Sequence, residues 1–181
     1  MSRALIVIDV QESFRARPDW ADIDNRDIAV PVMRLVEAAR AAGDLVVWVL
    51  HSEPGSGTVF DPASGHVRLL GELERRDEEP LLIKTTVNAF TSTDLQRRLD
   101  AAGVEQLTIC GIRTDQCCET TTRIANDLGY DVTFVTDATT TSGVDGLSAA
   151  QLIDRTERVL RARGFARIAT TDEIVAGAAV A

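Results

Sequence analysis

The sequence has few cysteines, and they lie close together. The chain of 181 residues contains three, Cys110, Cys117 and Cys118. This number and this clustering exclude a disulfide framework of the kind that stabilises small secreted domains. We therefore expect free thiols and a reducing compartment, the cytoplasm.

Positive charge and long apolar runs are also scarce. Lys and Arg number 19 against 28 Asp and Glu, so the formal net charge is −9. Nucleic acid is not an expected partner, because a phosphate backbone selects basic surfaces. The apolar run in MSRALIVIDVQ is too short to span a membrane, is interrupted by an Asp and lacks the layout of a signal peptide. We therefore expect neither a membrane partner nor a leader.

No linker, low-complexity tract or clear repeat divides the chain. Apolar residues make up 45% and charged residues 26%, which is ordinary for a globular protein. A chain of this length can bury a core without disulfides or a structural metal. We expect one domain over residues 1–181.

Apolar runs alternate with helical patterns. Runs rich in Val and Ile suit strands that are buried on both faces, as in a parallel sheet. They cover residues 4–10, 45–50, 81–83, 107–112 and 132–135, with a weaker run at 167–170. Helical patterns cover 28–39, 93–102, 114–128 and the segment from Ser148 to Gly164. The order predicts an α/β fold: a three-layer αβα sandwich with a mainly parallel, Rossmann-like sheet of about six strands, and a ligand site beyond the carboxyl ends of those strands.

Three chemically useful side chains are expected at those strand ends. Asp9 lies near the end of the first run, Lys84 directly follows the third, and Cys117 lies just beyond the fourth. Thr114 is a plausible helix N-cap, which places Cys117 in the first turn, where the helix dipole favours a thiolate. A carboxylate beside a thiol can take its proton and later return it to a leaving amine. We expect Cys117 to titrate below the ~8.5 of a free cysteine.

Each residue also has a plainer interpretation. An Asp at a strand end is often a turn or cap residue, and a lysine taken alone is more often solvated. Cys110 and Cys118 fit small buried core residues. The functional interpretation of Asp9, Lys84 and Cys117 therefore depends on all three being considered together.

Four segments resemble the isochorismatase-like cysteine hydrolases, a family that includes nicotinamidases, N-carbamoylsarcosine amidases and isochorismatases. The segments are ALIVIDVQESF, KTTVNAF, GIRTDQCCETTTRIANDLGY and VTFVTDAT, in the family's order. The resemblance implies that Asp9, Lys84 and Cys117 form a catalytic triad. It also implies a cis peptide between Ile112 and Arg113, with the N–H groups of Arg113 and Cys117 as an oxyanion hole.

The sequence departs from the metal-binding nicotinamidases of that family. These carry an Asp-x-His pair after the second strand, whereas this chain has Val49, Leu50 and His51, with His66 well downstream. We therefore expect no metal and no other cofactor. Substrate contacts are expected from a further set of residues: Phe14, His51, Asn88, Arg113 and Gln116. The Arg113 side chain could pair with a carboxylate or point to solvent.

The expected function is hydrolysis of a small amide, or a related carbon–nitrogen bond, through a thioester on Cys117. An isochorismatase reaction on a vinyl ether is the nearest alternative, although it does not require a cysteine nucleophile. A non-catalytic or redox-sensing binding protein on the same fold is the alternative from another class. The partner is expected to be a small-molecule substrate, and the resemblance implies a homo-oligomer, a dimer or larger.

Overall fold

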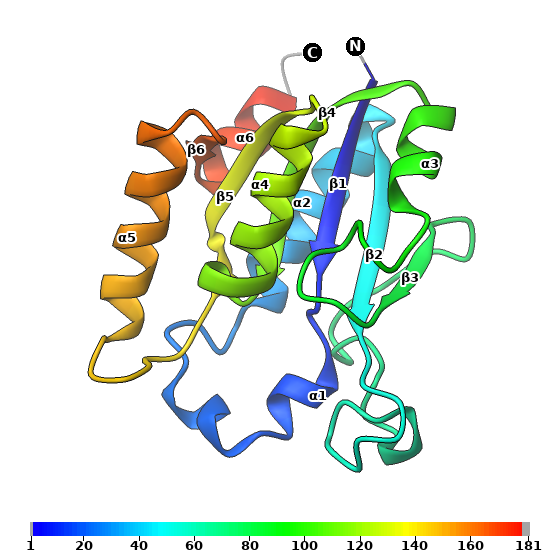
Figure 1. Cartoon of the computed structure of the whole chain (residues 1–181). Coiled ribbons are helices and arrows are strands. Elements are labelled where there is room, and N and C mark those ends of the chain that lie inside the picture. The colour runs from blue at the N-terminus through cyan, green and yellow to red at the C-terminus, as the bar shows by residue number, and fades with distance from the viewer. Residues whose placement is uncertain (1, 179–181) are drawn as a thin grey trace.

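Six parallel strands form one sheet in the computed structural model, which describes residues 2–178 (Figure 1). Their order across the sheet is β3-β2-β1-β4-β5-β6. The strands are β1 (Ser2–Ile8), β2 (Leu45–His51), β3 (Leu81–Lys84), β4 (Val104–Ile112), β5 (Asp131–Thr140) and β6 (Arg167–Ala169). The predicted parallel sheet is confirmed, and each expected run falls on one of these strands.

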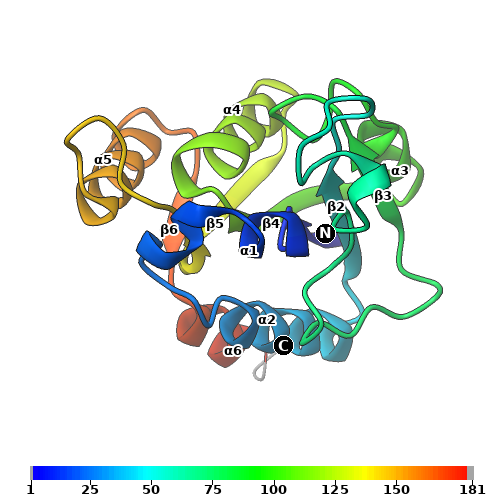
Figure 2. The same ribbon diagram turned by 90° about the horizontal axis from the view of Figure 1, so that it is seen from below.

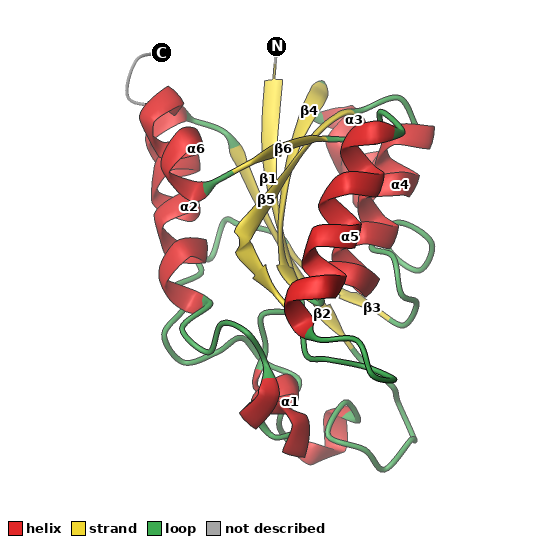
Figure 3. Ribbon diagram, turned by 90° about the vertical axis from the view of Figure 1, so that its left-hand side faces the viewer, coloured by secondary structure: helices red, strands yellow, loops and turns green. Residues whose placement is uncertain are grey.

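Helices cover both faces of the sheet, so the predicted three-layer sandwich is also confirmed. One layer holds α2 (Ala29–Ala42) and α6 (Thr171–Ala178), which pack against each other. The other holds α3 (Leu95–Ala101), α4 (Glu119–Asp127) and α5 (Ala149–Ala162) (Figures 2 and 3). Short helical segments complete the chain: α1 (Glu12–Arg15), η1 (Pro18–Asp22), η2 (Pro62–Ser64) and η3 (Thr114–Cys118). Among the described residues, no helix is long and apolar enough to cross a membrane.

The core consists of two apolar layers, one on each side of the sheet. Alternate residues of β1 contribute to each, with Ile6 in the layer under α3, α4 and α5 and Leu5 in the layer under α2. Both side chains are almost fully buried. A strand that is apolar on both faces therefore reflects a sheet that helices cover on both sides.

Helix ends follow the expected signals in two places and depart from them in a third. Ser148 caps α5 with a capping box to Gln151, and Gly43 ends α2 in the left-handed conformation. The predicted helix over 114–128 is wrong in its first part, because η3 is a π-helical turn and α4 begins at Glu119. Thr114 is not the N-cap; its hydroxyl donates instead to Thr139 Oγ1 at 2.8 Å.

The strand order reverses between β1 and β4, the switch point at which ligands bind in open α/β sheets. Gly111 allows these two strands to approach closely at their carboxyl ends. Its φ is +132°, and a Cβ there would lie 1.9 Å from the carbonyl oxygen of Ile8. The segments that follow β1 and β4, which carry Asp9 and Cys117, therefore begin close together at the carboxyl edge of the sheet.

Candidate active site

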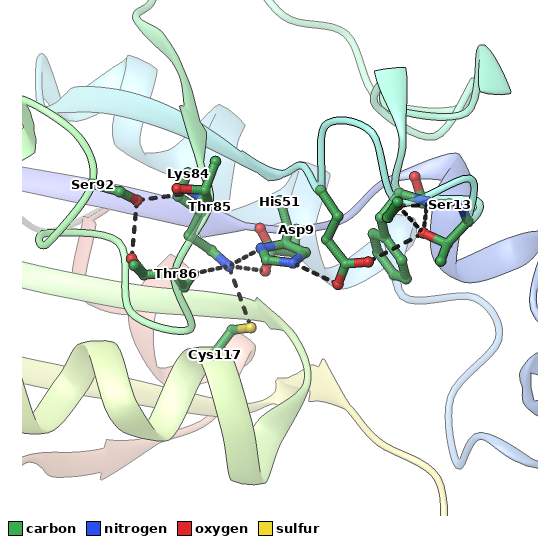
Figure 4. Close-up of polar contacts among 12 residues, drawn as sticks. Asp9, Ser13, His51, Lys84, Thr85, Thr86, Ser92 and Cys117 are labelled. Atoms are coloured by element: carbon green, nitrogen blue, oxygen red, sulfur yellow. Dashed lines mark hydrogen bonds and ion pairs between the residues drawn. The ribbon is translucent and has the colours of Figure 1, made fainter. Parts of the chain in front are cut away.

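Asp9, Lys84 and Cys117 meet at the carboxyl edge of the sheet, although they come from three separate strand ends (Figure 4). Lys84 Nζ lies 2.7 Å from Asp9 Oδ2 and 3.4 Å from Cys117 Sγ. Asp9 and Lys84 have no exposed surface, and Cys117 retains 8%. A buried ion pair beside a thiol is costly in free energy unless it is well compensated, so its presence here favours a functional role.

The backbone at Asp9 is in a conformation that few residues adopt. Its φ is +56°, in the left-handed region that favours glycine. The Asp9 N–H donates to the carbonyl oxygen of Val49 at 2.8 Å, which ties this strained residue to β2. Strain at a non-glycine residue persists when its surroundings enforce it, and it concentrates at functional sites.

Lys84 is the last residue of β3 and pairs in register with His51, the last residue of β2. Its ammonium group also contacts His51 Nδ1 at 3.4 Å and the carbonyl oxygen of Thr86 at 3.2 Å. The expectation that an isolated lysine is solvated fails here, because β3 ends against Asp9 and the side chain is enclosed.

Cys117 belongs to the π-helical turn η3, whose Cys118 N–H donates to the carbonyl oxygen of Arg113 at 3.1 Å. Single π-helical turns are rare in proteins, and those that do occur are often found at functional sites. The Ile112–Arg113 peptide is cis, as the resemblance implied. Cys110 and Cys118 are fully buried, which confirms their assignment to the core.

The expected low pKa of Cys117 is wrong. Burial, followed by the negative charge of Asp9, raises the pKa of the Cys117 thiol to about 12 against the lowering effect of Lys84. Lys84 favours the thiolate, but the loss of water around the buried sulfur disfavours it by more. Burial therefore favours the thiol form of Cys117 over the thiolate.

Burial also governs the other two groups. It raises the pKa of Asp9, since the attraction of Lys84 offsets only part of the lost hydration. For Lys84, burial favours the neutral amine, but the charges of Asp9 and Cys117 outweigh it and hold its pKa above the ordinary value. A carboxylate with a raised pKa is a stronger base, so Asp9 is suited to accept the thiol proton.

Two of the expected substrate-binding residues lie against each other near this centre. Phe14 is buried, with its ring 5.0 Å from that of Phe60, and the Arg113 guanidinium lies 5.6 Å from the Phe14 ring centroid. The Arg113 side chain does not point to solvent: it pairs with a carboxylate, that of Asp19 in η1, and it donates to Ser142 Oγ.

The other three expected contacts lie in different settings. The His51 ring lies against Lys84, and Gln116 is exposed in the turn before Cys117. The Asn88 side chain organises its own loop, because its Oδ1 accepts from the backbone N–H groups of Phe90 and Thr91 at 2.9 Å. Substrate contact by any of these residues stays a prediction.

Gln11 is a site residue that the sequence argument did not find. It is fully buried, its Nε2 donates to the His51 carbonyl at 3.0 Å, and its Oε1 accepts from the His51 N–H at 2.7 Å. These two bonds fix the end of β2 against the segment after β1. The signal available was a polar residue two positions beyond Asp9, directly after an apolar run.

Glu119, at the start of α4, is a second buried polar residue near Cys117. Its carboxylate accepts from Arg123, Arg155 and Thr156, which anchors the first residue after the π-helical turn to α5. In residues 2–178, no group of three or more His, Cys, Asp or Glu side chains is arranged to hold a metal ion.

Comparisons with known proteins identify a family for this chain. Residues 3–173 match the family described as the isochorismatase domain. Nicotinamidase 3 of Arabidopsis thaliana is 32% identical over 76% of this chain and 73% of its own, and a probable inactive nicotinamidase of the same plant is 33% identical over 75% and 79%. The crystal structure of a cysteine hydrolase from Pseudomonas syringae pv. phaseolicola superposes with a TM-score of 0.86 at 26% identity, covering 98% of this chain and 92% of that one.

Proposed function

This chain belongs to the isochorismatase family of hydrolases, and we propose that it cleaves a small amide, or a related carbon–nitrogen bond, through a thioester on Cys117. The observation that carries the proposal is the buried contact of Lys84 Nζ with Asp9 at 2.7 Å and with Cys117 at 3.4 Å. A binding protein has no need of a buried base, cation and thiol in contact. The similarity to a nicotinamidase and to a cysteine hydrolase supports the same chemistry.

In the proposed first half-reaction, Asp9 takes the proton of the Cys117 thiol as sulfur attacks the carbonyl carbon. Because burial favours the protonated thiol, the thiolate in this proposal forms during the attack rather than before it. Lys84 stabilises the charge that develops on sulfur and keeps the Asp9 carboxylate in place. The N–H group of Arg113, which follows the cis peptide bond, and that of Cys117, within the π-helical turn, would receive the tetrahedral oxyanion.

In the second half, Asp9 returns the proton to the leaving amine and the carbon–nitrogen bond breaks, leaving an acyl group on Cys117. Water then loses a proton to Asp9 and attacks the thioester. The acid departs, and the sulfur regains its proton. Asp9 therefore acts alternately as base and acid, the role for which its raised pKa suits it.

A panel of small amides, carbamoyl compounds and lactams, assayed for release of ammonia or acid, tests this function. The proposal expects at least one amide to be hydrolysed by the wild type and not by a folded Cys117→Ala variant. Isochorismate belongs in the panel, because hydrolysis of this vinyl ether with full retention of activity in Cys117→Ala would replace the amide proposal. Reversible thiol–disulfide changes without any turnover would instead support a redox-sensing protein.

A further inference from the structure

The Lys84 ammonium group has more neighbouring acceptors than it has hydrogens. A protonated lysine offers three N–H donors. Asp9 Oδ2 lies at 2.7 Å and the Thr86 carbonyl oxygen at 3.2 Å, and these shorter contacts account for two of them. Cys117 Sγ and His51 Nδ1, both at 3.4 Å, are left to share the third (Figure 4).

The surroundings of His51 determine which ring nitrogen carries the hydrogen. Nε2 lies 3.3 Å from Glu53 Oε1, and a carboxylate only accepts, so Nε2 must donate. The Lys84 ammonium group 3.4 Å from Nδ1 only donates, so Nδ1 presents its lone pair to it. The other oxygen of Glu53 accepts from the Thr58 hydroxyl at 3.1 Å, which fixes the carboxylate that sets this tautomer.

The ring itself is held on two further sides. Gln11 fixes the backbone of His51 through both its N–H and its carbonyl group. Phe60 packs edge-on against the imidazole, with the ring centroids 5.5 Å apart. His51 is therefore built into the centre as a rigid acceptor for Lys84.

We propose that His51 is a positioning residue that accepts the third N–H of Lys84 while Cys117 is a thiol and releases it to the sulfur when the thiolate forms, with Glu53 setting the required tautomer. A thiol sulfur is a weak acceptor compared with an imidazole nitrogen, whereas a thiolate is a strong, charged one. The thiol proton goes to Asp9, and at His51 nothing but a hydrogen bond is exchanged. The inference rests on the proposed function in taking Cys117 as the nucleophile.

Removing the Nδ1 acceptor should lower the pKa of Cys117. Without His51 Nδ1, the third Lys84 N–H is buried beside a weak acceptor in the thiol state but still gains a full partner in the thiolate state. The thiol state alone therefore loses stabilisation, and the Cys117 pKa falls. Asp9, Lys84 and Cys118 are the other titratable groups acting on the Cys117 thiol, and they are unchanged in this comparison.

The test is the pH dependence of iodoacetamide alkylation at Cys117, read by peptide mapping so that Cys110 and Cys118 are counted apart. His51→Leu fills the space without an acceptor and should give about tenfold more thiolate at a given pH, from the strength of a hydrogen bond with a charged donor. Glu53→Ala should shift the profile in the same direction, because the ring is then free to adopt the other tautomer.

His51→Asn is the matched control, since its amide oxygen can replace Nδ1. The pH profile of alkylation in His51→Asn should match that of the wild type. The double variant His51→Asn/Glu53→Ala should show no further shift. An unchanged or upward-shifted pKa in His51→Leu, or equal shifts in His51→Leu and His51→Asn, would overturn the proposal. If His51→Leu does not fold, Glu53→Ala decides, because the Glu53 side chain is 43% exposed.

Alkylation requires no substrate, so this result is separate from the proposed hydrolysis. Turnover that survives Cys117→Ala would refute the amide mechanism while leaving the alkylation profiles interpretable. Normal amide hydrolysis with profiles that His51→Leu does not move would refute the role of His51 alone.

Discussion

Replacing Lys84 by Met should make the stability of the protein depend steeply on pH. The substitution keeps most of the volume of the side chain and removes its charge. Asp9, which has no exposed surface, then loses the cation 2.7 Å away. Breaking a buried ion pair by removing one partner costs about 3–5 kcal/mol when the remaining charge stays buried.

Asp9 can avoid that cost by binding a proton, and this determines the direction in which stability changes with pH. Its folded-state pKa is already raised by burial and rises further without Lys84. A carboxyl group with a raised folded pKa binds more protons when folded than when unfolded, so stability falls as the pH rises from about 3.9 to the folded pKa. The slope between these two pKa values is about 1.4 kcal/mol per pH unit.

Urea unfolding of Lys84→Met between pH 4 and pH 8, with the wild type alongside, measures this dependence. The double variant Lys84→Met/Asp9→Asn has no carboxylate at position 9 to bind a proton. It should recover most of the stability at pH 7 and lose the pH dependence of stability that Lys84→Met introduces. A Lys84→Met protein that loses the same stability at every pH would refute the argument, because the loss would then come from packing and not from the unpaired Asp9.

Three further outcomes are expected. Glu79→Ala should destabilise the protein by about 3 kcal/mol in urea unfolding, since it removes the carboxylate that pairs with Arg40 and accepts from the buried Trp48 N–H. Burial alone would raise the pKa of Glu79, but these hydrogen bonds lower it. The stabilisation by Glu79 is therefore complete above the ordinary glutamate pKa and is lost as the pH falls through the folded pKa. Cys110→Ala and Cys118→Ala should keep most of the turnover, and an inactive but folded Cys118→Ala would contradict the choice of nucleophile. Activity should survive exhaustive chelation, and a purified protein that holds stoichiometric zinc or iron and loses activity on its removal would contradict this.

The fold could be predicted because its signals are local and repeated. Each buried strand is an apolar run of Val and Ile, and the alternation with helical patterns leaves a parallel sheet as the consistent solution. The same logic places Asp9 and Lys84 at one edge, because parallel strands end together. The C-terminal helix α6 was not predicted, since its segment TDEIVAGA is short and carries only a weak apolar pattern.

The electrostatics of the site could not be read in the same way. The direction of the Cys117 pKa depends on how completely the surrounding loops exclude water, which no short motif encodes. The connection from Glu53 through His51 to Lys84 depends on the register between β2 and β3 and on the clamp from Gln11. Self-association and location in the cell stay predictions.

Peptide mass spectrometry during turnover can detect the proposed acyl group on Cys117. Wild-type protein is mixed with a hydrolysed amide from the panel, quenched in acid within the steady state and mapped. We predict that the peptide containing Cys117 gains the mass of the substrate's acyl group and that hydroxylamine removes it. The Cys117→Ala protein should show neither adduct nor turnover. Steady hydrolysis by Cys117→Ala at the wild-type rate, with no adduct on the wild-type peptide, would contradict this prediction.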